Sequence, residues 1–317
     1  MSKRAEKHTG IIVALAWPKT YCRQAGAWYD PLMNLLGFSH NHFYKVGHAA
    51  LLLVNPDTNQ CHYFDFGRYH SPFGTGRVRS EVTDPELTVR TKAIIEKDRI
   101  VNLDIILKEM QSKEVYHGDE TLFASTTTIN FKSAYNKAIE LQKKSPMVYG
   151  PYVRQGTNCS RFVNTVILAG KPKLNQVFKL IFGQPTTPTP RGNVNALNDK
   201  HRREKPLVLR PFNPYDVTAE VLKSTAPAPV KIESVPKGVR WLSGEGYGSW
   251  YDIQPNGSTI SVSRYSPKGL LEFKAEYVPE FDVKILNKDY ELSYLSHFKE
   301  INIVQNGKKY TLRNVNL

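Results

Sequence analysis

A cysteine in the middle of the chain has a position that could make it a nucleophile. Cys159 follows Asn158, a residue type that favours the N-cap of a helix, so the thiol is expected at the first helical position. The unpaired N–H groups and the positive end of the helix dipole at that position favour a thiolate, which attacks carbonyl carbons. The same N–H groups can hold an oxyanion. Because cysteine is also among the most often buried residue types, an inert core thiol is the alternative.

A cysteine nucleophile needs an imidazole as base and a third group that orients the imidazole. His48 lies early in the apolar run VGHAALLLV, which predicts a strand, and the turn NPDTNQ leads into a second strand, CHYFDFGRY. If Asn55 pairs with Gln60, His48 and Asp65 share one face of this hairpin. A slip of one residue would place His62 there instead. We favour Asp65 as the orienting group and keep His62 as the alternative.

The elements that must position these residues alternate in type along the first half of the chain. Apolar runs bounded by turn residues predict strands at 10–17, 44–54, 61–69 and 122–129. Apolar periodicity and capping residues, among them Asn130, predict helices at 26–38, 101–111, 131–144 and 159–170. This mixture predicts an α+β fold.

Composition divides the 317 residues into three parts. Residues 1–170 form the predicted α+β domain. Residues 171–206 are rich in Pro, Thr and basic side chains, which predicts a linker or mobile excursion. Residues 207–317 carry strand and turn signals, including a predicted turn at Asn306-Gly307 and a short helix near 289–297. We expect a small β-rich domain there whose role the sequence does not indicate.

The motifs around His48 and Cys159 resemble those of a known enzyme family. G-H-A in a strand, followed much later by Tyr149-Gly150 and by N-C-S at a helix start, resembles the papain-like NlpC-type cysteine hydrolases. The histidine precedes the cysteine, an order that is similar to the circularly permuted branch, which includes lecithin:retinol acyltransferase-like proteins. The resemblance covers about residues 10–170.

The resemblance implies both a fold and a reaction. The helix of Cys159 would pack on an antiparallel sheet that carries His48, and an acyl group would be cleaved or transferred through a thioester. Side chains expected near the substrate are Tyr149, Asn158, Ser160 and His62. Asn158 stands where the unpermuted family often has aspartate, which argues against recognition of a free amino group. Arg161 stands where glycine is common, which indicates a different and more basic rim.

The charge of the chain is unevenly distributed. The net charge is +14, and residues 1–206 contain 29 of the 43 Lys and Arg but 17 of the 29 Asp and Glu. A basic first domain favours an anionic partner such as a nucleic acid, an anionic lipid or a polyanionic polymer, although a solvated basic surface is an equal alternative. The arginines Arg68, Arg77 and Arg79 lie among glycines, which indicates either an anion-holding loop or a mobile, solvated loop.

Other patterns in the sequence indicate the cellular compartment and whether a cofactor is expected. Three cysteines do not form a disulfide framework, and no stretch has the length of a signal peptide or a membrane span. These features predict a cytoplasmic protein and leave a non-standard export route open. His40 and His42 form H-x-H, but without a second ligand motif we expect no metal and no cofactor.

Three functions of different classes follow. The first is a thiol hydrolase or acyltransferase that acts on a peptide, amide, isopeptide or ester, with Cys159, His48 and Asp65 as catalytic residues. The second is a non-catalytic binding module on the same fold with a basic face. The third, a nucleic-acid-binding protein, is disfavoured because the sequence has no recognisable nucleic-acid-binding motif.

Overall fold

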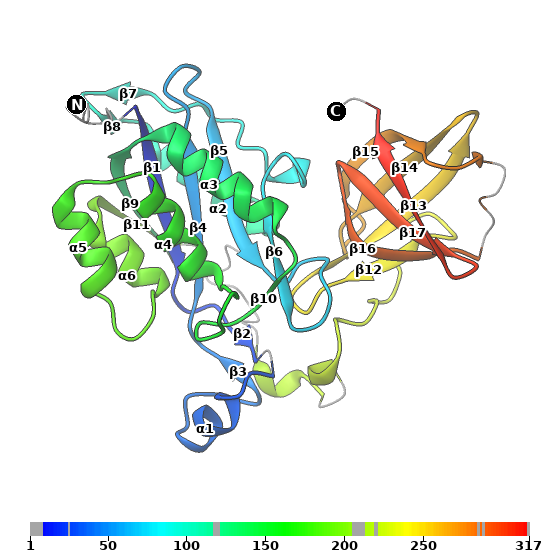
Figure 1. The fold of residues 1–317 in the computed structure, drawn as a ribbon, viewed down its shortest axis with the longest axis horizontal. Coiled ribbons are helices and arrows are strands. Elements are labelled where there is room, and N and C mark those ends of the chain that lie inside the picture. Colours follow the sequence, from blue (N-terminus) through cyan, green and yellow to red (C-terminus); the bar gives the residue numbers. More distant parts are fainter. Residues whose placement is uncertain are drawn as a thin grey trace.

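The computed structural model describes residues 9–24, 26–116, 121–204, 213–218, 221–283, 286 and 289–315. These residues form two β-rich domains (Figure 1), each built around a seven-stranded sheet. The predicted boundary between residues 206 and 207 lies outside the described residues. Among the described residues, no helix combines the length and apolar character needed to cross a membrane.

The first sheet is antiparallel throughout and belongs to the amino-terminal domain. Its strands, in spatial order, are β10 (Met147–Val148), β6 (Thr75–Arg79), β5 (Cys61–Gly67), β4 (His48–Val54), β1 (Gly10–Trp17), β9 (Leu122–Ile129) and β11 (Asn198–Arg203). Strands β1 and β4 are apolar on both faces because helices or loops cover both faces. The predicted α+β class is confirmed.

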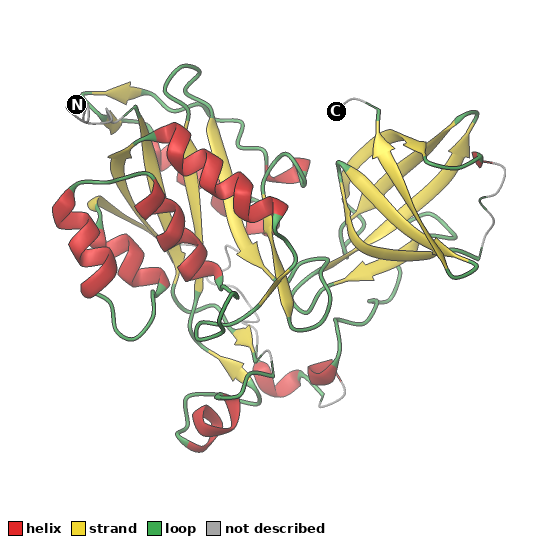
Figure 2. Ribbon diagram, in the orientation of Figure 1, coloured by secondary structure: helices red, strands yellow, loops and turns green. Residues whose placement is uncertain are grey.

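Helices cover the two faces of this sheet (Figure 2). The helices that lie against the sheet are α2 (Leu103–Ser112), α3 (Phe131–Lys143), α4 (Cys159–Ala169), α5 (Leu174–Phe182) and α6 (Pro190–Ala196). Helices α3, α4 and α6 share a core with Ala49 and Leu51, whereas α2 packs with Ala50 and Leu52 on the opposite face. Asn130 caps α3 as predicted, since its side chain accepts a hydrogen bond from the Ser133 N–H.

Two excursions interrupt the sheet order. Between β1 and β4, the excursion of residues 18–47 contains β2 (Cys22–Arg23), helix α1 (Asp30–Leu35) and β3 (Phe43–Tyr44). A short hairpin of β7 (Ile95–Glu96) and β8 (Arg99–Ile100) precedes α2. Short 3₁₀ turns lie at Pro85–Leu87, Glu114–Tyr116, Pro214–Asp216 and Val221–Lys223.

The prediction of a linker at residues 171–206 was wrong. The segment folds as α5, α6 and β11, and β11 pairs with β9 at the edge of the first sheet. Its polar composition has a structural reason. Alternate residues of the edge strand β11 are exposed, Asn193 of α6 is buried in polar contacts with α4, and Gln176 of α5 accepts a hydrogen bond from Thr127 of β9. Residues 171–203 therefore belong to the amino-terminal domain.

The carboxy-terminal domain is a nearly closed seven-stranded barrel (Figure 1). Its strands, in spatial order, are β12 (Arg240–Ser243), β13 (Gly248–Asn256), β14 (Thr259–Tyr265), β15 (Leu271–Pro279), β18 (Lys308–Asn314), β17 (Glu300–Gln305) and β16 (Glu291–His297). The predicted turn at Asn306-Gly307 is confirmed, with φ of 53° and 73° at these residues. The expected helix near 289–297 is instead strand β16, which pairs with β17.

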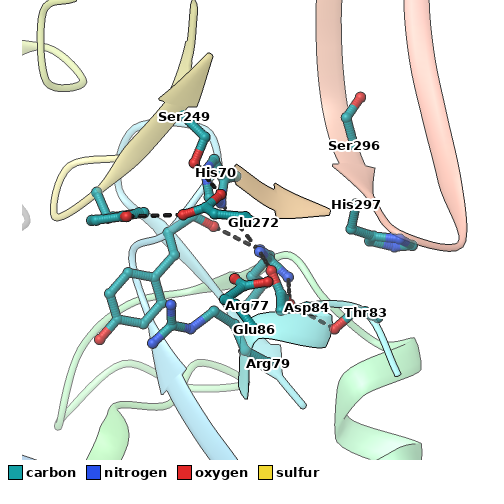
Figure 3. A network of polar contacts seen from close by, with 12 residues as sticks. His70, Arg77, Arg79, Thr83, Asp84, Glu86, Ser249, Glu272, Ser296 and His297 are labelled. Carbon is teal, nitrogen blue, oxygen red and sulfur yellow. Dashed lines mark hydrogen bonds and ion pairs between the residues drawn. The ribbon is translucent and has the colours of Figure 1, made fainter. Parts of the chain in front are cut away.

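Buried ion pairs join the two domains. Arg264 of β14 binds Asp84 and Glu86 of the amino-terminal domain, and Asp84 is also held by Arg77. Figure 3 shows this network, with His70 between Arg77 and Ser249. Together with Arg68 and Arg79, Arg77 is buried, so the interpretation as a mobile, solvated loop was wrong. The anionic groups that these arginines hold are carboxylates of the protein itself.

Candidate active site

Helix α4 places Cys159 at its first turn. The Asn158 side-chain oxygen accepts a hydrogen bond from the Arg161 N–H over 2.8 Å, which confirms the predicted N-cap. The apolar face of the helix, with Phe162 and Val163, packs on the sheet and turns Cys159 inward, so the residue is 5% exposed. The thiol therefore lies at the amino end of a helix that is firmly packed on the sheet.

Strand β4 begins with His48, which is 8% exposed. Gly47, just before it, has φ of +79°, and a Cβ atom there would lie 2.6 Å from the Trp17 carbonyl oxygen. Only glycine allows this approach without strain, which explains the G-H pair in the sequence. The His48 ring stacks on Trp17, with 5.7 Å between ring centres, and Tyr69 meets it edge-on.

The hairpin of β4 and β5 has the predicted register. The Asn55 N–H donates to the Gln60 carbonyl, and Ala50 pairs with Asp65. The Nε2 atom of His48 consequently lies 3.6 Å from Oδ2 of Asp65. The hairpin therefore brings the imidazole and the carboxylate together on one face.

Charge and hydrogen bonding link His48 to both neighbours. Burial disfavours the imidazolium, but hydrogen bonds with Asp65 and Cys159 outweigh burial and raise the pKa of His48 to about 9. Burial likewise disfavours the thiolate, but hydrogen bonding to His48, the imidazolium charge and the Ala49 N–H together lower the pKa of Cys159. The raised pKa of His48 and the lowered pKa of Cys159 both shift the site towards a thiolate beside an imidazolium.

Asp65 is held in place from its other side. The side chain is fully buried, and Arg79 on the paired strand β6 binds both carboxylate oxygens, at 3.0 and 2.6 Å. Tyr63 donates a hydrogen bond to Oδ2 over 3.0 Å. Burial alone would raise the pKa of Asp65, but Arg79 and then His48 hold it well below its usual range. Asp65 therefore stays ionised as it faces His48.

His62 does not join this group. It lies on the opposite face of β5, where Nδ1 is 2.6 Å from Oε1 of Glu81 and the ring packs against Phe131 and Tyr135. The alternation of side chains along a strand separates His62 from Asp65. His62 therefore neither orients His48 nor lies where it was expected to contact a substrate.

The other residues expected near a substrate differ in their contacts. Ser160 lies beside it, with 3.8 Å between Oγ and Sγ of Cys159. Tyr149 stacks on Phe66, and its hydroxyl contacts the Cys22 sulfur over 3.3 Å. Asn158 has its side-chain oxygen engaged in the helix cap.

Arg161, which the sequence placed at the rim, donates three hydrogen bonds to carbonyls of the loop before Cys159. Their acceptors are Gly150, Pro151 and Val153. Within the described residues there is no cluster of three or more His, Cys, Asp or Glu side chains that could hold a metal ion.

Sequence reasoning missed Cys22 and did not connect Arg68 or Arg79 with the residues around Cys159. Arg79 pairs with Asp65 through strand β6, which the sequence analysis interpreted as a loop, so the partner of Asp65 was not predicted. Cys22 and Arg68 meet at Tyr149, but no local pattern signals this contact because the three residues are far apart in the sequence.

The chain matches known families in both domains. The family described as "Type VI secretion system effector TseH-like" matches residues 12–175, more than half of the chain, and the "DUF6695 C-terminal domain" matches residues 239–315. The crystal structure of the type VI secretion system effector TseH is similar with 15% identity and a TM-score of 0.41, over 62% of this chain and 93% of that chain. No curated protein matches the chain.

Proposed function

Because the chain belongs to the TseH-like family of type VI secretion system effectors, we propose that it is a secreted cysteine hydrolase that cleaves an amide bond. The observation that carries this proposal is the arrangement of His48 between the buried carboxylate of Asp65 and the thiol of Cys159. A nucleophile, a base and an orienting group in this order are what acyl transfer requires. The order His48 before Cys159 also agrees with the resemblance to permuted NlpC-type hydrolases.

The reaction follows from the charges of the site. The Cys159 thiolate attacks the carbonyl carbon, and the N–H groups at the start of α4 stabilise the oxyanion. His48 donates its proton to the leaving amine, so the C–N bond breaks and a thioester forms. A water molecule, deprotonated by His48, then attacks the thioester and releases the acid and the thiol. Asp65 remains ionised throughout and stabilises the imidazolium.

We place the substrate in the bacterial cell wall. The family name indicates a protein that leaves the cell that makes it, so we propose action outside that cell in place of the cytoplasmic location that the lack of a signal segment suggested. The charge of the catalytic region supports a polyanionic target. Residues 141–198, which include α4, contain eight Lys and Arg and no Asp or Glu. A cell-wall peptide linked to such a polymer combines an amide bond with negative charge.

Digestion of purified cell-wall sacculi tests this proposal. The wild-type protein should release soluble peptides that carry a new amino or carboxyl end, as identified by mass spectrometry. Cys159→Ala should release none while binding the sacculi as tightly as the wild type. If the wild type binds sacculi and releases nothing, the alternative of a non-catalytic binding module with a basic face is correct.

A further inference from the structure

Two segments of the chain meet close to Cys159. Tyr149 pairs with Thr157, two residues before Cys159, and its ring packs against the hydrophobic cluster that contains Cys159. The Tyr149 hydroxyl in turn contacts Cys22, which belongs to the excursion of residues 18–47. The loop of residues 149–158 and the excursion of residues 18–47 therefore contact each other near the thiol. We call these two segments together the wall.

Arg68 holds the two parts of this wall together. Its Nη2 atom donates to Cys22 Sγ over 3.4 Å and to the Arg23 carbonyl, and Nη1 donates to the Gln24 carbonyl over 3.3 Å. The guanidinium carbon lies 4.6 Å from the centre of the Tyr149 ring. The guanidinium thus contacts the excursion with its N–H groups and the loop with its face.

The charge that fixes Arg68 comes from the carboxy-terminal domain. Glu245, between β12 and β13, has a fully buried side chain whose Oε2 lies 2.7 Å from Arg68 Nη1 and 3.0 Å from Arg23 Nη2. Its Oε1 accepts a hydrogen bond from the Gly74 N–H over 2.5 Å. Two buried arginines of the wall thus depend on one carboxylate from the other domain.

The remaining ion pairs between the domains lie in a different cluster. Arg264 binds Asp84 and Glu86 of the amino-terminal domain and Glu272 of its own domain, and Figure 3 shows these carboxylates. A second contact with the excursion comes from the segment before the barrel, where the Asn41 side chain donates to the Pro214 and Val217 carbonyls. The carboxy-terminal part of the chain therefore contacts the amino-terminal domain through Arg264 and, separately, contacts the wall through Glu245 and the segment of residues 214–217.

We propose that Glu245 is a positioning residue through which the carboxy-terminal domain holds the wall of the active site closed against Cys159. This role rests on the proposed function, because the wall would form one side of the substrate site. Without the carboxylate, Arg68 and Arg23 lose their shared partner, and Cys22 and Tyr149 separate from each other more often. Substrate binding then weakens while the Cys159–His48 pair stays intact.

Alkylation of the three cysteines in the folded full-length protein measures this directly. We expect Glu245→Gln to raise the iodoacetamide labelling rates of Cys159 and Cys22 about tenfold at pH 7, with Cys61 unchanged. The matched control is Glu86→Gln, which replaces a partly buried carboxyl group in the other interdomain cluster and should leave the Cys159 rate as in the wild type. The second variant, Asn41→Asp, places a carboxylate against the Pro214 and Val217 carbonyls and should raise the labelling rates of Cys159 and Cys22 by a smaller factor. It tests the proposal independently if Glu245→Gln does not fold.

The outcomes separate the two proposals. Wild-type labelling rates in both Glu245→Gln and Asn41→Asp would overturn the positioning role, as would an equal rise in Glu86→Gln. On sacculi, Glu245→Gln should raise KM more than it lowers kcat. Labelling needs no substrate, so a faster rate without any hydrolysis by the wild type would remove the proposed function and keep the positioning role.

Discussion

The Nε2 atom of His48 lies 3.6 Å from Oδ2 of Asp65, and Arg79 binds both oxygens of this carboxylate from the far side. Three adjacent strands supply the three residues, so the sheet itself sets their order. Asp65 therefore both favours the charged form of His48 and neutralises the buried guanidinium of Arg79.

Asp65→Asn should therefore affect stability as well as reactivity. The substitution leaves Arg79 buried without its counter-charge, which lowers the free energy of unfolding by roughly 3–5 kcal/mol. Because the pKa of Asp65 is lowered in the folded protein, its contribution is present above the unfolded pKa of about 4 and is lost as pH falls below that value. Urea unfolding should show a wild-type advantage at pH 6 that shrinks towards pH 2. The control Asp57→Asn, in an exposed turn, should match the wild type at both pH values.

His48→Gln should remove the base without removing the nucleophile. We expect hydrolysis of sacculi to fall at least about 10³-fold, because proton transfer to and from Cys159 loses its carrier. His62→Gln is the matched control on the same hairpin and should retain activity, since its ring faces Glu81 on the other side of the sheet. Equal losses in both variants, measured with both proteins folded, would contradict the assignment of His48.

Asn158→Ala should lower stability and also change the thiol. Loss of an N-cap costs about 1 kcal/mol, and the start of α4 that holds Cys159 then frays. Asn130→Ala removes the equivalent cap of α3 and provides a control with a similar stability loss. Thermal unfolding should shift alike in the two variants, whereas only Asn158→Ala should slow the alkylation of Cys159 at pH 6. Identical alkylation rates in the two variants would show that the helix start does not activate the thiol.

Arg161→Gln should loosen the loop ahead of Cys159. Arg161 donates to three carbonyls of residues 150–153, and the next residue, Arg154, is an exposed trypsin site. Limited trypsin digestion should therefore cut after Arg154 several times faster in the variant, because the loop opens more often. Cleavage at the wild-type rate would mean that other contacts hold the loop.

Local patterns predicted the geometry around His48 well. The turn after β4 fixed its register with β5 and thus the face shared by His48 and Asp65, and Asn158 marked the start of α4. These features depend on neighbours in the sequence, where turn chemistry and capping act.

Ion pairs and strand pairings between residues far apart in the chain could not be predicted from the sequence, for physical reasons. Arg68 and Arg77 gave the pattern of an exposed basic loop because their carboxylate partners, Glu245 and Asp84, cannot be assigned without the fold. The edge strand β11 gave the composition of a linker because an edge strand exposes half of its side chains to water.

The central claim is that His48 keeps Cys159 as a thiolate at neutral pH, and the pH dependence of alkylation tests it most directly. The rate of Cys159 carbamidomethylation should remain high at pH 6, because its pKa is lowered by His48, and should fall only under more acidic conditions. Cys61, whose pKa burial raises to about 12, should stay unlabelled over the same range. A Cys159 rate that rises only above pH 8, like that of a free thiol, would contradict the account.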